Sequence, residues 1–308
     1  MNETIKIGTR GSKLALYQAN RLKAELQEKF PDAQIEIIVI KTKGDKILDV
    51  ALSKIGDKGL FTKEIETALI EGTIDMAVHS LKDLPTVLPE GLVLGGVLER
   101  GEFRDALVSL NGKKLADLTS NDVIATSSLR RKAQLLKVNP DFNIIDIRGN
   151  VNTRIEKMKN GYCTAMVMAA AGLQRLGYNE YISEILDVES VIPATAQGII
   201  AIETRENDDR INRFITGINH EPSYLAAFAE RKFLNTLEGG CQIPVGCYTE
   251  FTDDIFKITG FISMPDGSDL IEGSLSGKKE DAESIAKELA LSFQQKGAFK
   301  IVEFIRKI

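Results

Sequence analysis

Hydrophobic residues fall into short runs that alternate with longer segments of helical period. A run at 5–9 leads through a polar junction into an amphipathic pattern from about Lys13 to Phe30, and a second run follows at 35–40. A further helix, from about Thr62 to Glu71, precedes an apolar run at 75–79. Strands that alternate with helices of this length predict an α/β fold, with a mainly parallel sheet flanked by helices on both faces.

The same alternation begins again near Phe103, with strands expected at 123–126, 143–147 and 165–169, each followed by a helix. From about Glu221 the pattern changes. One helix, several strands separated by turn residues, and a last helix predict a small α+β domain on an antiparallel sheet.

These patterns predict three domains. We expect a first α/β lobe from 1–99 with 198–218, a second from 100–197, and a C-terminal α+β domain from 219–308. Two lobes joined by chain crossings near 100–104 and 193–198 would form a cleft that can hinge.

Composition excludes several classes of protein. The 308 residues carry a formal net charge of −5, whereas a general nucleic-acid surface needs a basic excess. The N-terminus lacks the pattern of a signal peptide, and no apolar run approaches the roughly 20 residues of a membrane span. We therefore expect a cytoplasmic protein with no membrane or nucleic-acid partner. We also expect a monomer, because no long apolar stripe is left over for a partner. Three cysteines and two histidines form no metal-binding pattern, so no metal site is expected.

Positive charge concentrates at polar segments that resemble strand-to-helix junctions. Helix N-termini and guanidinium groups both bind carboxylates or phosphates, so these junctions predict an anionic ligand. A surface ion pair is the alternative for any single arginine, and helix capping for any single hydroxyl. The arginines are Arg10, Arg130, Arg131, Arg148, Arg154 and Arg175, and their polar neighbours include Ser12, Thr126, Ser127, Ser128, Asn150 and Thr153.

Two further residues have reactive side chains. Cys241 lies between two glycines and a Gln-Ile-Pro turn, which suits a displayed thiol that anchors a group covalently; a small buried cysteine is the alternative. Asp83 ends an apolar strand beside Lys82, and it can stabilise a developing cation or shuttle a proton. An Asx turn before Pro85 is the alternative for Asp83.

The stretch 41–60 is rich in lysine and glycine, and it predicts either a mobile lid over an anionic ligand or a solvated loop. Lys58 belongs to this stretch. Phe61, directly after it, is either a core residue or a surface for stacking on a flat ring.

Six segments, in order along nearly the whole chain, resemble the porphobilinogen deaminase family, also called hydroxymethylbilane synthases. They are GTRGS at 8–12, HSLKDLP at 79–85, TSSLRR at 126–131, RGNVNTR at 148–154, AAAGLQRLG at 169–177, and the segment from ERKFL to GGCQIPVG at 230–246.

The resemblance implies two lobes similar to periplasmic binding proteins and a cysteine-bearing third domain. It also implies a transferase of tetrapyrrole and haem biosynthesis that joins four porphobilinogen units head to tail, releases ammonia, and frees linear hydroxymethylbilane by hydrolysis. A dipyrromethane cofactor would be bound to Cys241 through a thioether, and the product would pass to uroporphyrinogen-III synthase.

The resemblance also implies roles for the residues above. Asp83 would contact pyrrole N–H groups and stabilise the cation formed as ammonia leaves, and the six arginines would neutralise the ligand's carboxylates. The remaining contacts would come from Lys82, Ser12, Thr126, Ser127, Ser128 and Gln197.

Two positions depart from the pattern expected of the family. Ala196 replaces a glycine near the proposed hinge, and Thr164 replaces an acidic residue. Two alternatives stay open at this point: a two-lobed carboxylate-binding protein without catalysis, and an acyl- or phosphotransferase with a cysteine nucleophile.

Overall fold

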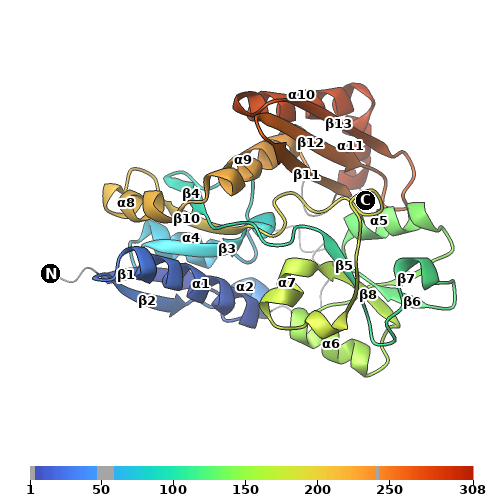
Figure 1. Cartoon of the computed structure of the whole chain (residues 1–308), viewed down its shortest axis with the longest axis horizontal. Coiled ribbons are helices and arrows are strands. Elements are labelled where there is room, and N and C mark those ends of the chain that lie inside the picture. Colours follow the sequence, from blue (N-terminus) through green and yellow to red (C-terminus); the bar gives the residue numbers. More distant parts are fainter. Residues whose placement is uncertain (1–3, 47–58, 240–242, 308) are drawn as a thin grey trace. The chain divides into compact units, whose positions relative to one another are not determined.

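The computed structural model describes residues 4–46, 59–239 and 243–307 (Figure 1). The chain divides into two compact units, Met1–Gly101 with Ile199–Tyr224, and Glu102–Gly198 with Leu225–Ile308. Within the described residues, no helix is long and apolar enough to cross a membrane.

Unit 1 is built on a five-stranded sheet of order β2-β1-β3-β10-β4. The first face is covered by α1 and α8, whose leucine, isoleucine and phenylalanine side chains share a core with strand residues such as Ile7 and Val78. The other face is covered by α4 through Ile65 and Leu69. Its elements are β1 (Thr4–Thr9), α1 (Lys13–Lys29), β2 (Gln34–Val39), α2 (Lys43–Lys46), α4 (Lys63–Ile70), β3 (Met76–Ser80), the 3₁₀ helix η1 (Leu81–Asp83), β4 (Leu92–Val97), β10 (Ile200–Arg205) and α8 (Asp209–Ile218).

Unit 2 contains a second five-stranded sheet, of order β7-β6-β8-β5-β9, with separate cores on its two faces. Leu135 of α5 packs on one face, and Ile155 of α6 and Leu173 of α7 pack on the other. The elements are β5 (Asp105–Ser109), η2 (Leu115–Asp117), β6 (Val123–Ala125), α5 (Leu129–Val138), β7 (Asn143–Ile145), α6 (Val151–Lys159), β8 (Ala165–Ala169), α7 (Ala170–Arg175), η3 (Asn179–Tyr181) and β9 (Ile182–Ile185).

The two sheets share the same spatial order and directions of strands, although the reversed strand comes last along the chain in unit 1 and first in unit 2. In unit 1, β1 pairs parallel with β2 and β3, and in unit 2, β6 pairs parallel with β7 and β8. One strand of each sheet, β10 or β5, pairs antiparallel with both of its neighbours. Four strands of each sheet therefore run in one direction and one runs against them. The predicted α/β fold with parallel-rich sheets is confirmed, and the reversed strand is the feature that alternation of elements did not predict.

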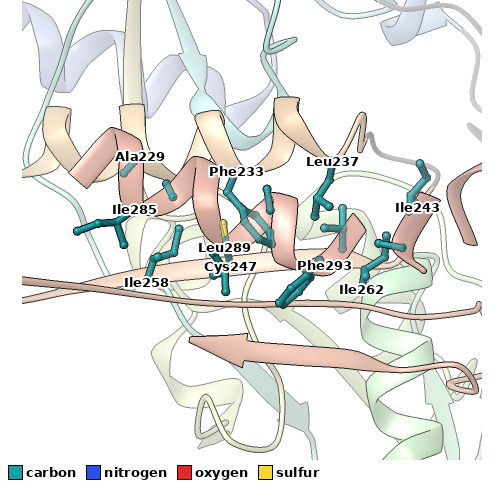
Figure 2. Close-up of a cluster of buried hydrophobic side chains, with 14 of the residues drawn as sticks. Ala229, Phe233, Leu237, Ile243, Cys247, Ile258, Ile262, Ile285, Leu289 and Phe293 are labelled. Carbon is teal, nitrogen blue, oxygen red and sulfur yellow. The ribbon is translucent and has the colours of Figure 1, made fainter. Parts of the chain in front are cut away.

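The C-terminal part of unit 2 is an antiparallel sheet of order β11-β12-β13 backed by helices, as predicted. Phe233 of α9 and Phe293 of α10 meet edge to face in its core, with ring centroids 5.5 Å apart (Figure 2). Burying each such ring contributes about 1.5–3 kcal/mol. The elements are α9 (Glu221–Thr236), β11 (Val245–Thr252), β12 (Ile255–Ile262), β13 (Ile271–Lys278), η4 (Lys279–Asp281), α10 (Ala282–Gln295) and α11 (Ala298–Lys307).

Within unit 2 this antiparallel sheet packs closely on the segment that follows β9. Tyr248 of β11 stacks on Phe103, with centroids 5.8 Å apart. A Cβ atom at Gly246 would lie 2.4 Å from the carbonyl oxygen of Pro193, so only glycine allows β11 to approach this segment. The sheet that follows the predicted cofactor loop is thereby fixed to the chain between residues 188 and 197.

The structure shows the local surroundings of both departures from the family pattern. Ala196 adopts a φ of +58°, a left-handed conformation that favours glycine, and its N–H donates to the buried Glu230 carboxylate at 2.6 Å. Thr249 donates to the other oxygen of Glu230 at 2.9 Å. Thr164 accepts the N–H of Val123 through its hydroxyl at 3.1 Å, an acceptor role that an acidic residue also fills.

The conformation of Ala196 predicts a position-specific loss of stability. Ala196→Val would place a branched side chain at positive φ in a buried site, and we expect the free energy of unfolding to fall by about 2–3 kcal/mol. The control Ala24→Val, on an exposed position of α1, should cost about 0.5 kcal/mol. Thermal unfolding of both variants measures the difference, and equal melting temperatures would contradict the prediction.

Candidate functional site

Two of the predicted junctions lie side by side in unit 1. β1 and β3 are neighbouring parallel strands, so the segments after them, with Arg10 and Asp83, emerge at the same edge of the sheet. Ser12 caps α1 by accepting the N–H of Ala15 at 3.3 Å. Gln18 of α1 donates to the Ser80 hydroxyl at 2.8 Å and ties the helix to the end of β3.

Asp83 is exposed at the end of η1, between the buried side chains of Leu81 and Leu84. The Leu81 N–H donates to the carbonyl of Ile199 at 3.0 Å and holds the turn against the chain before β10. In the part of the chain that the structure describes, the Asp83 carboxylate accepts no hydrogen bond, so nothing there supports the Asx-turn alternative. Lys82 is partly buried beside it.

His79 lies on β3 and is buried against β10. Its Nε2 is 3.0 Å from the Glu203 carboxylate, and only 5% of its side chain is exposed. His220 is also engaged, because its Nδ1 lies 2.8 Å from the Ser223 hydroxyl. These contacts favour structural roles for both histidines over that of a base for a cysteine nucleophile.

Arg10 is paired within unit 1. Its Nε and Nη2 donate to Asp45 at 3.1 and 2.5 Å, and its guanidinium carbon lies 4.1 Å from the centre of the Phe61 ring. Burial raises the pKa of Asp45, but hydrogen bonds from Arg10 and Thr42 and the guanidinium charge outweigh it, so the pKa lies below its ordinary value. Phe61 thus stacks on a planar cation of the protein itself.

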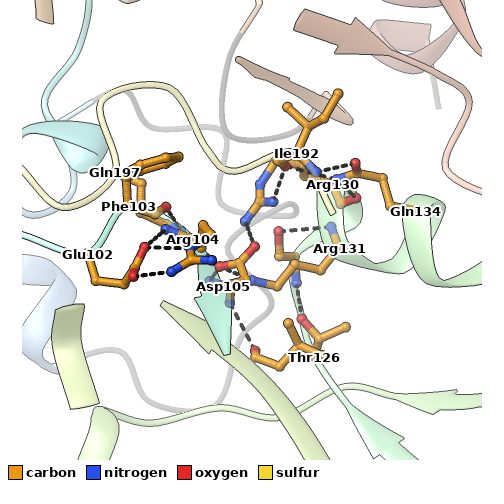
Figure 3. A network of polar contacts seen from close by, with 12 residues as sticks. Glu102, Phe103, Arg104, Asp105, Thr126, Arg130, Arg131, Gln134, Ile192 and Gln197 are labelled. Carbon is orange, nitrogen blue, oxygen red and sulfur yellow. Dashed lines mark hydrogen bonds and ion pairs between the residues drawn. The ribbon is translucent and has the colours of Figure 1, made fainter. Parts of the chain in front are cut away.

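A buried carboxylate organises the junctions of unit 2 (Figure 3). Asp105, at the start of β5, is fully buried and accepts hydrogen bonds from Arg130 and Arg131 at 2.7 Å each. Gln197 donates to the same carboxylate at 2.9 Å and to the carbonyl of Phe103 at 2.8 Å. One acidic group therefore joins β5, α5 and the segment before residue 198.

The charges of this cluster do not cancel. Burial raises the pKa of Asp105, but the two guanidinium charges and the hydrogen bonds outweigh it, so the carboxyl stays ionised well below its usual pKa. Burial lowers the pKa of Arg130, and Asp105 partly offsets this. Since arginine stays protonated, two positive groups face one negative group. Two further N–H groups donate to the backbone, from Arg130 to Ile192 at 2.6 Å and from Arg131 to Val167 at 3.1 Å.

The hydroxyl groups after β6 make local hydrogen bonds. Ser128 caps α5 by accepting the N–H of Arg131 at 3.4 Å, and Thr126 accepts the N–H of Ser128 at 3.3 Å. Ser127 donates to the carbonyl of Ile147 at 2.8 Å and accepts its N–H at 3.0 Å, which fixes the segment after β7. These are local contacts within the junction, as in helix capping. Contact of the same residues with a ligand stays a prediction.

The other arginines of unit 2 differ in the hydrogen bonds that their side chains make. Arg154 donates to the carbonyl of Gly149 at 2.7 Å, and Arg175 donates to that of Gly198 at 2.6 Å. Arg148 is partly exposed, and among the described residues its guanidinium has no hydrogen-bond or ion-pair partner. Asn150 caps α6 by accepting the N–H of Thr153 at 3.2 Å. The β7–α6 junction therefore combines an available cation with a helix N-terminus.

Cys241 and Lys58 lie outside the described residues. Both other cysteines are buried, and burial raises the pKa of Cys163 to about 11. Cys247 is fully buried and its sulfur lies 3.4 Å from the Thr195 hydroxyl. A thiol in such surroundings is a poor nucleophile. Within the described ranges, no group of histidine, cysteine and acidic residues could hold a metal ion.

Sequence reasoning missed Asp105 and Asp45. Both are acidic partners of predicted site arginines, and both lie far from them in the chain. The signal for Asp105 was an acidic residue at the expected start of the second lobe, where a strand that enters a core would ordinarily be apolar.

Comparison with known proteins identifies relatives along nearly the whole chain. The family described as porphobilinogen deaminase, dipyromethane cofactor binding domain, matches residues 5–213, and its C-terminal domain matches residues 224–295. The chain is 49% identical to a porphobilinogen deaminase of Syntrophomonas wolfei over 98% of this chain and 99% of that one. It is 46% identical to the enzyme of Geotalea uraniireducens, over 97% and 94% of the two chains.

Solved structures with a similar chain path share little sequence. The sulphonate-binding protein SsuA of Escherichia coli gives a TM-score of 0.42 at 17% identity, over 77% of this chain and 71% of that one. The BenM effector-binding domain with benzoate also gives 0.42, at 16% identity, over 72% and 93% of the two chains.

The buried carboxylate leads to a prediction about stability and its pH dependence. Asp105→Asn removes one charge and leaves two guanidinium groups buried without it, so we expect the free energy of unfolding to fall by about 3–5 kcal/mol at pH 7. Denaturant unfolding, with the exposed Asp141→Asn as a control, measures this loss.

The loss of stability caused by Asp105→Asn should become smaller as the pH falls. Folding lowers the pKa of Asp105, so its contribution is complete above the ordinary pKa of about 3.9 and is lost as the pH falls toward the folded-state value. The difference between the wild type and Asp105→Asn should therefore narrow below about pH 4. A difference that stays constant from pH 7 to pH 3 would contradict this assignment.

Proposed function

The chain belongs to the porphobilinogen deaminase family, and we propose that its basic junctions, Asp83 and Cys241 together form the active site. The protein is a transferase, a hydroxymethylbilane synthase. It condenses four porphobilinogen molecules head to tail on a dipyrromethane cofactor, with loss of ammonia, and hydrolysis then releases linear hydroxymethylbilane. The observation that carries the assignment of the site is the exposed Asp83 carboxylate, held at the sheet edge where Arg10 also emerges.

The donor groups of the chain fit a ligand of this chemistry. Each pyrrole of dipyrromethane bears an acetate and a propionate, and carboxylates are bound by guanidinium groups and helix N-termini. The Arg148 guanidinium has no partner among the described residues, and the Asp105 cluster has one more positive than negative group. When bound, the cofactor supplies the pyrrole carbon to which the first porphobilinogen is joined.

We assign Cys241 as the attachment residue. Cys163 and Cys247 are both buried, and the pKa of Cys163 is raised by burial, which supports the remaining cysteine. β11 begins four residues after Cys241, and Gly246 allows this strand to pack against Pro193 within unit 2.

Asp83 would act on the substrate. A fixed carboxylate stabilises positive charge that develops on the pyrrole ring as ammonia leaves, and it can accept the proton lost from the attacked carbon. The buried side chains of Leu81 and Leu84 hold the backbone of the turn that presents Asp83.

The remaining predicted residues would bind the ligand's carboxylates or complete the site. They are Arg10, Ser12, Lys82, Thr126, Ser127, Ser128, Arg130, Arg131, Arg148, Arg154, Arg175 and Gln197, with Lys58 and Phe61 as lid or stacking residues. The division into lobes 1–99 with 198–218 and 100–197, and a C-terminal domain 219–308, is likewise a proposal. So are the monomeric state, the cytoplasmic location and transfer of the product to uroporphyrinogen-III synthase.

The attachment role of Cys241 predicts a change in intact mass. The purified, denatured wild type should exceed the mass of its sequence by two linked pyrrole units, located on the peptide that holds Cys241. We expect Cys241→Ser to lack this excess, because serine cannot form the thioether. Cys163→Ser and Cys247→Ser are matched controls that should keep it. An adduct of full mass on Cys241→Ser would refute the assignment.

The role of Asp83 predicts a loss of turnover with little loss of folding. Asp83→Asn keeps the size of the side chain and removes its charge, so we expect kcat to fall by about 10²–10³-fold, in the range for a lost acid–base or charge-stabilising group. The exposed Asp32→Asn of the same unit is the control and should keep wild-type activity. Porphobilinogen consumption measures both, and a kcat for Asp83→Asn within twofold of the wild type would exclude Asp83 from the chemistry.

A further inference from the structure

Four residues of unit 1 hold the side chain of Arg10, and we call them the Arg10 cradle: Thr42, Gly44, Asp45 and Phe61. Asp45 Oδ1 accepts from both Nε and Nη2 of Arg10, at 3.1 and 2.5 Å. The Phe61 ring covers one face of the guanidinium at 4.1 Å. The cradle thus restrains the guanidinium along one edge and across one face.

The Asp45 carboxylate is itself held in place. Its second oxygen, Oδ2, accepts the hydroxyl of Thr42 at 2.8 Å and the N–H of Thr42 at 3.2 Å. Thr42 is fully buried, so this anchor is rigid. Both carboxylate oxygens of Asp45 are therefore committed, one to the anchor and one to Arg10.

The Phe61 ring packs so closely against residue 44 that only glycine fits at that position. A Cβ atom at Gly44 would lie 2.2 Å from Cε1 of Phe61. The Gly44 N–H donates to the carbonyl of Leu60 at 2.9 Å, and the Lys43 N–H donates to Glu64 at 3.0 Å. These bonds fix α2 against the start of α4 and thereby fix the ring.

The cradle leaves one end of the guanidinium uncommitted. Arginine has five N–H donors, and within the described residues Arg10 uses only those on Nε and Nη2, toward Asp45. Its side chain is 29% exposed. An arginine held along its Nε–Nη2 edge can still bind a second carboxylate end-on through Nη1 and Nη2.

We propose that Asp45 is a positioning residue, which orients Arg10 so that its Nη1 end receives a carboxylate of the substrate. This inference rests on the proposed role of Arg10 as a carboxylate-binding residue. The cradle removes the rotational freedom that a long side chain would otherwise lose on binding, so binding loses less entropy.

Two effects of Asp45 on a bound carboxylate oppose each other. The negative charge of Asp45 repels the ligand, but the pair is partly exposed and solvent screens that repulsion. Orientation by the cradle favours the ligand. The geometry points to orientation as the larger effect. Thr42 and Gly44 maintain the orientation of the cradle through contacts that play no part in the repulsion between Asp45 and the ligand.

A double-mutant cycle on the cofactor-loaded enzyme tests the proposal, with loading checked by intact mass and folding by thermal unfolding. Asparagine has one acceptor oxygen in place of two, and its NH2 group cannot accept a hydrogen bond. Asp45→Asn therefore leaves the N–H donors of either Arg10 or Thr42 without an acceptor. We expect Asp45→Asn to raise KM for porphobilinogen about tenfold with kcat changed less than about twofold. On an Arg10→Gln background the same substitution should change KM less than about twofold, because the two residues act as one.

A second variant tests the cradle without altering its charge. Gly44→Ala should displace the Phe61 ring and also raise KM. The control is Gly273→Ala in β13, where an added Cβ meets Phe293 at an ordinary 3.4 Å. A lower KM for Asp45→Asn would show that Asp45 competes with the substrate and would overturn the proposal, as would losses that simply add in the double variant.

The cycle also separates this inference from the proposed role of Arg10. If Arg10→Gln leaves KM unchanged, Arg10 does not bind the substrate, and both statements are wrong. If Arg10→Gln raises KM while Asp45→Asn and Gly44→Ala do not, Arg10 keeps its role and only the positioning by the cradle is refuted.

Discussion

The buried carboxylate of Asp105 is the interaction on which unit 2 depends. Arg130 and Arg131 are 5% and 7% exposed, and two guanidinium groups cannot be buried side by side without a counter-charge. Asp105 supplies that charge from the start of β5, and Gln197 adds a hydrogen bond from the other chain crossing. Asp105 therefore ties α5, and with it the β6–α5 junction, to the start of β5.

The arginine–aspartate pairs of the two units differ in how much they contribute to stability. Arg10 follows β1 as Arg130 and Arg131 follow β6, and β1 and β6 occupy equivalent places in sheets of the same order. The Arg10–Asp45 pair is 29% exposed on both sides, where an ion pair contributes only about 0–1 kcal/mol to stability. The Arg10–Asp45 pair therefore contributes little to stability, although Thr42 holds Asp45 in place. Separating the Asp105 pairs would cost far more, because it would leave a buried charge without compensation.

The sequence predicted the parts of this structure that depend on local pattern. Apolar residues at helical spacing located α1, and alternation of strands and helices gave the α/β class. The reversed strands were not predictable in the same way, because β10 pairs with β3 over more than 100 residues. Asp45 and Asp105 were missed for the same reason, since each meets its arginine 25 or more residues away in the chain. The left-handed conformation of Ala196 was likewise hidden, because alanine rarely adopts it.

If the six arginines bind the ligand as proposed, their number overstates the positive charge that the ligand meets. Asp45 neutralises Arg10, and Asp105 neutralises one of the two arginines beside it, whereas Arg148 has no acidic partner among the described residues. A product that gains an acetate and a propionate with every ring would soon carry more negative charge than these groups supply. Helix N-termini capped by Ser12, Ser128 and Asn150 add partial charges of fixed position and finite number. Each added ring would then be bound with less electrostatic compensation than the last.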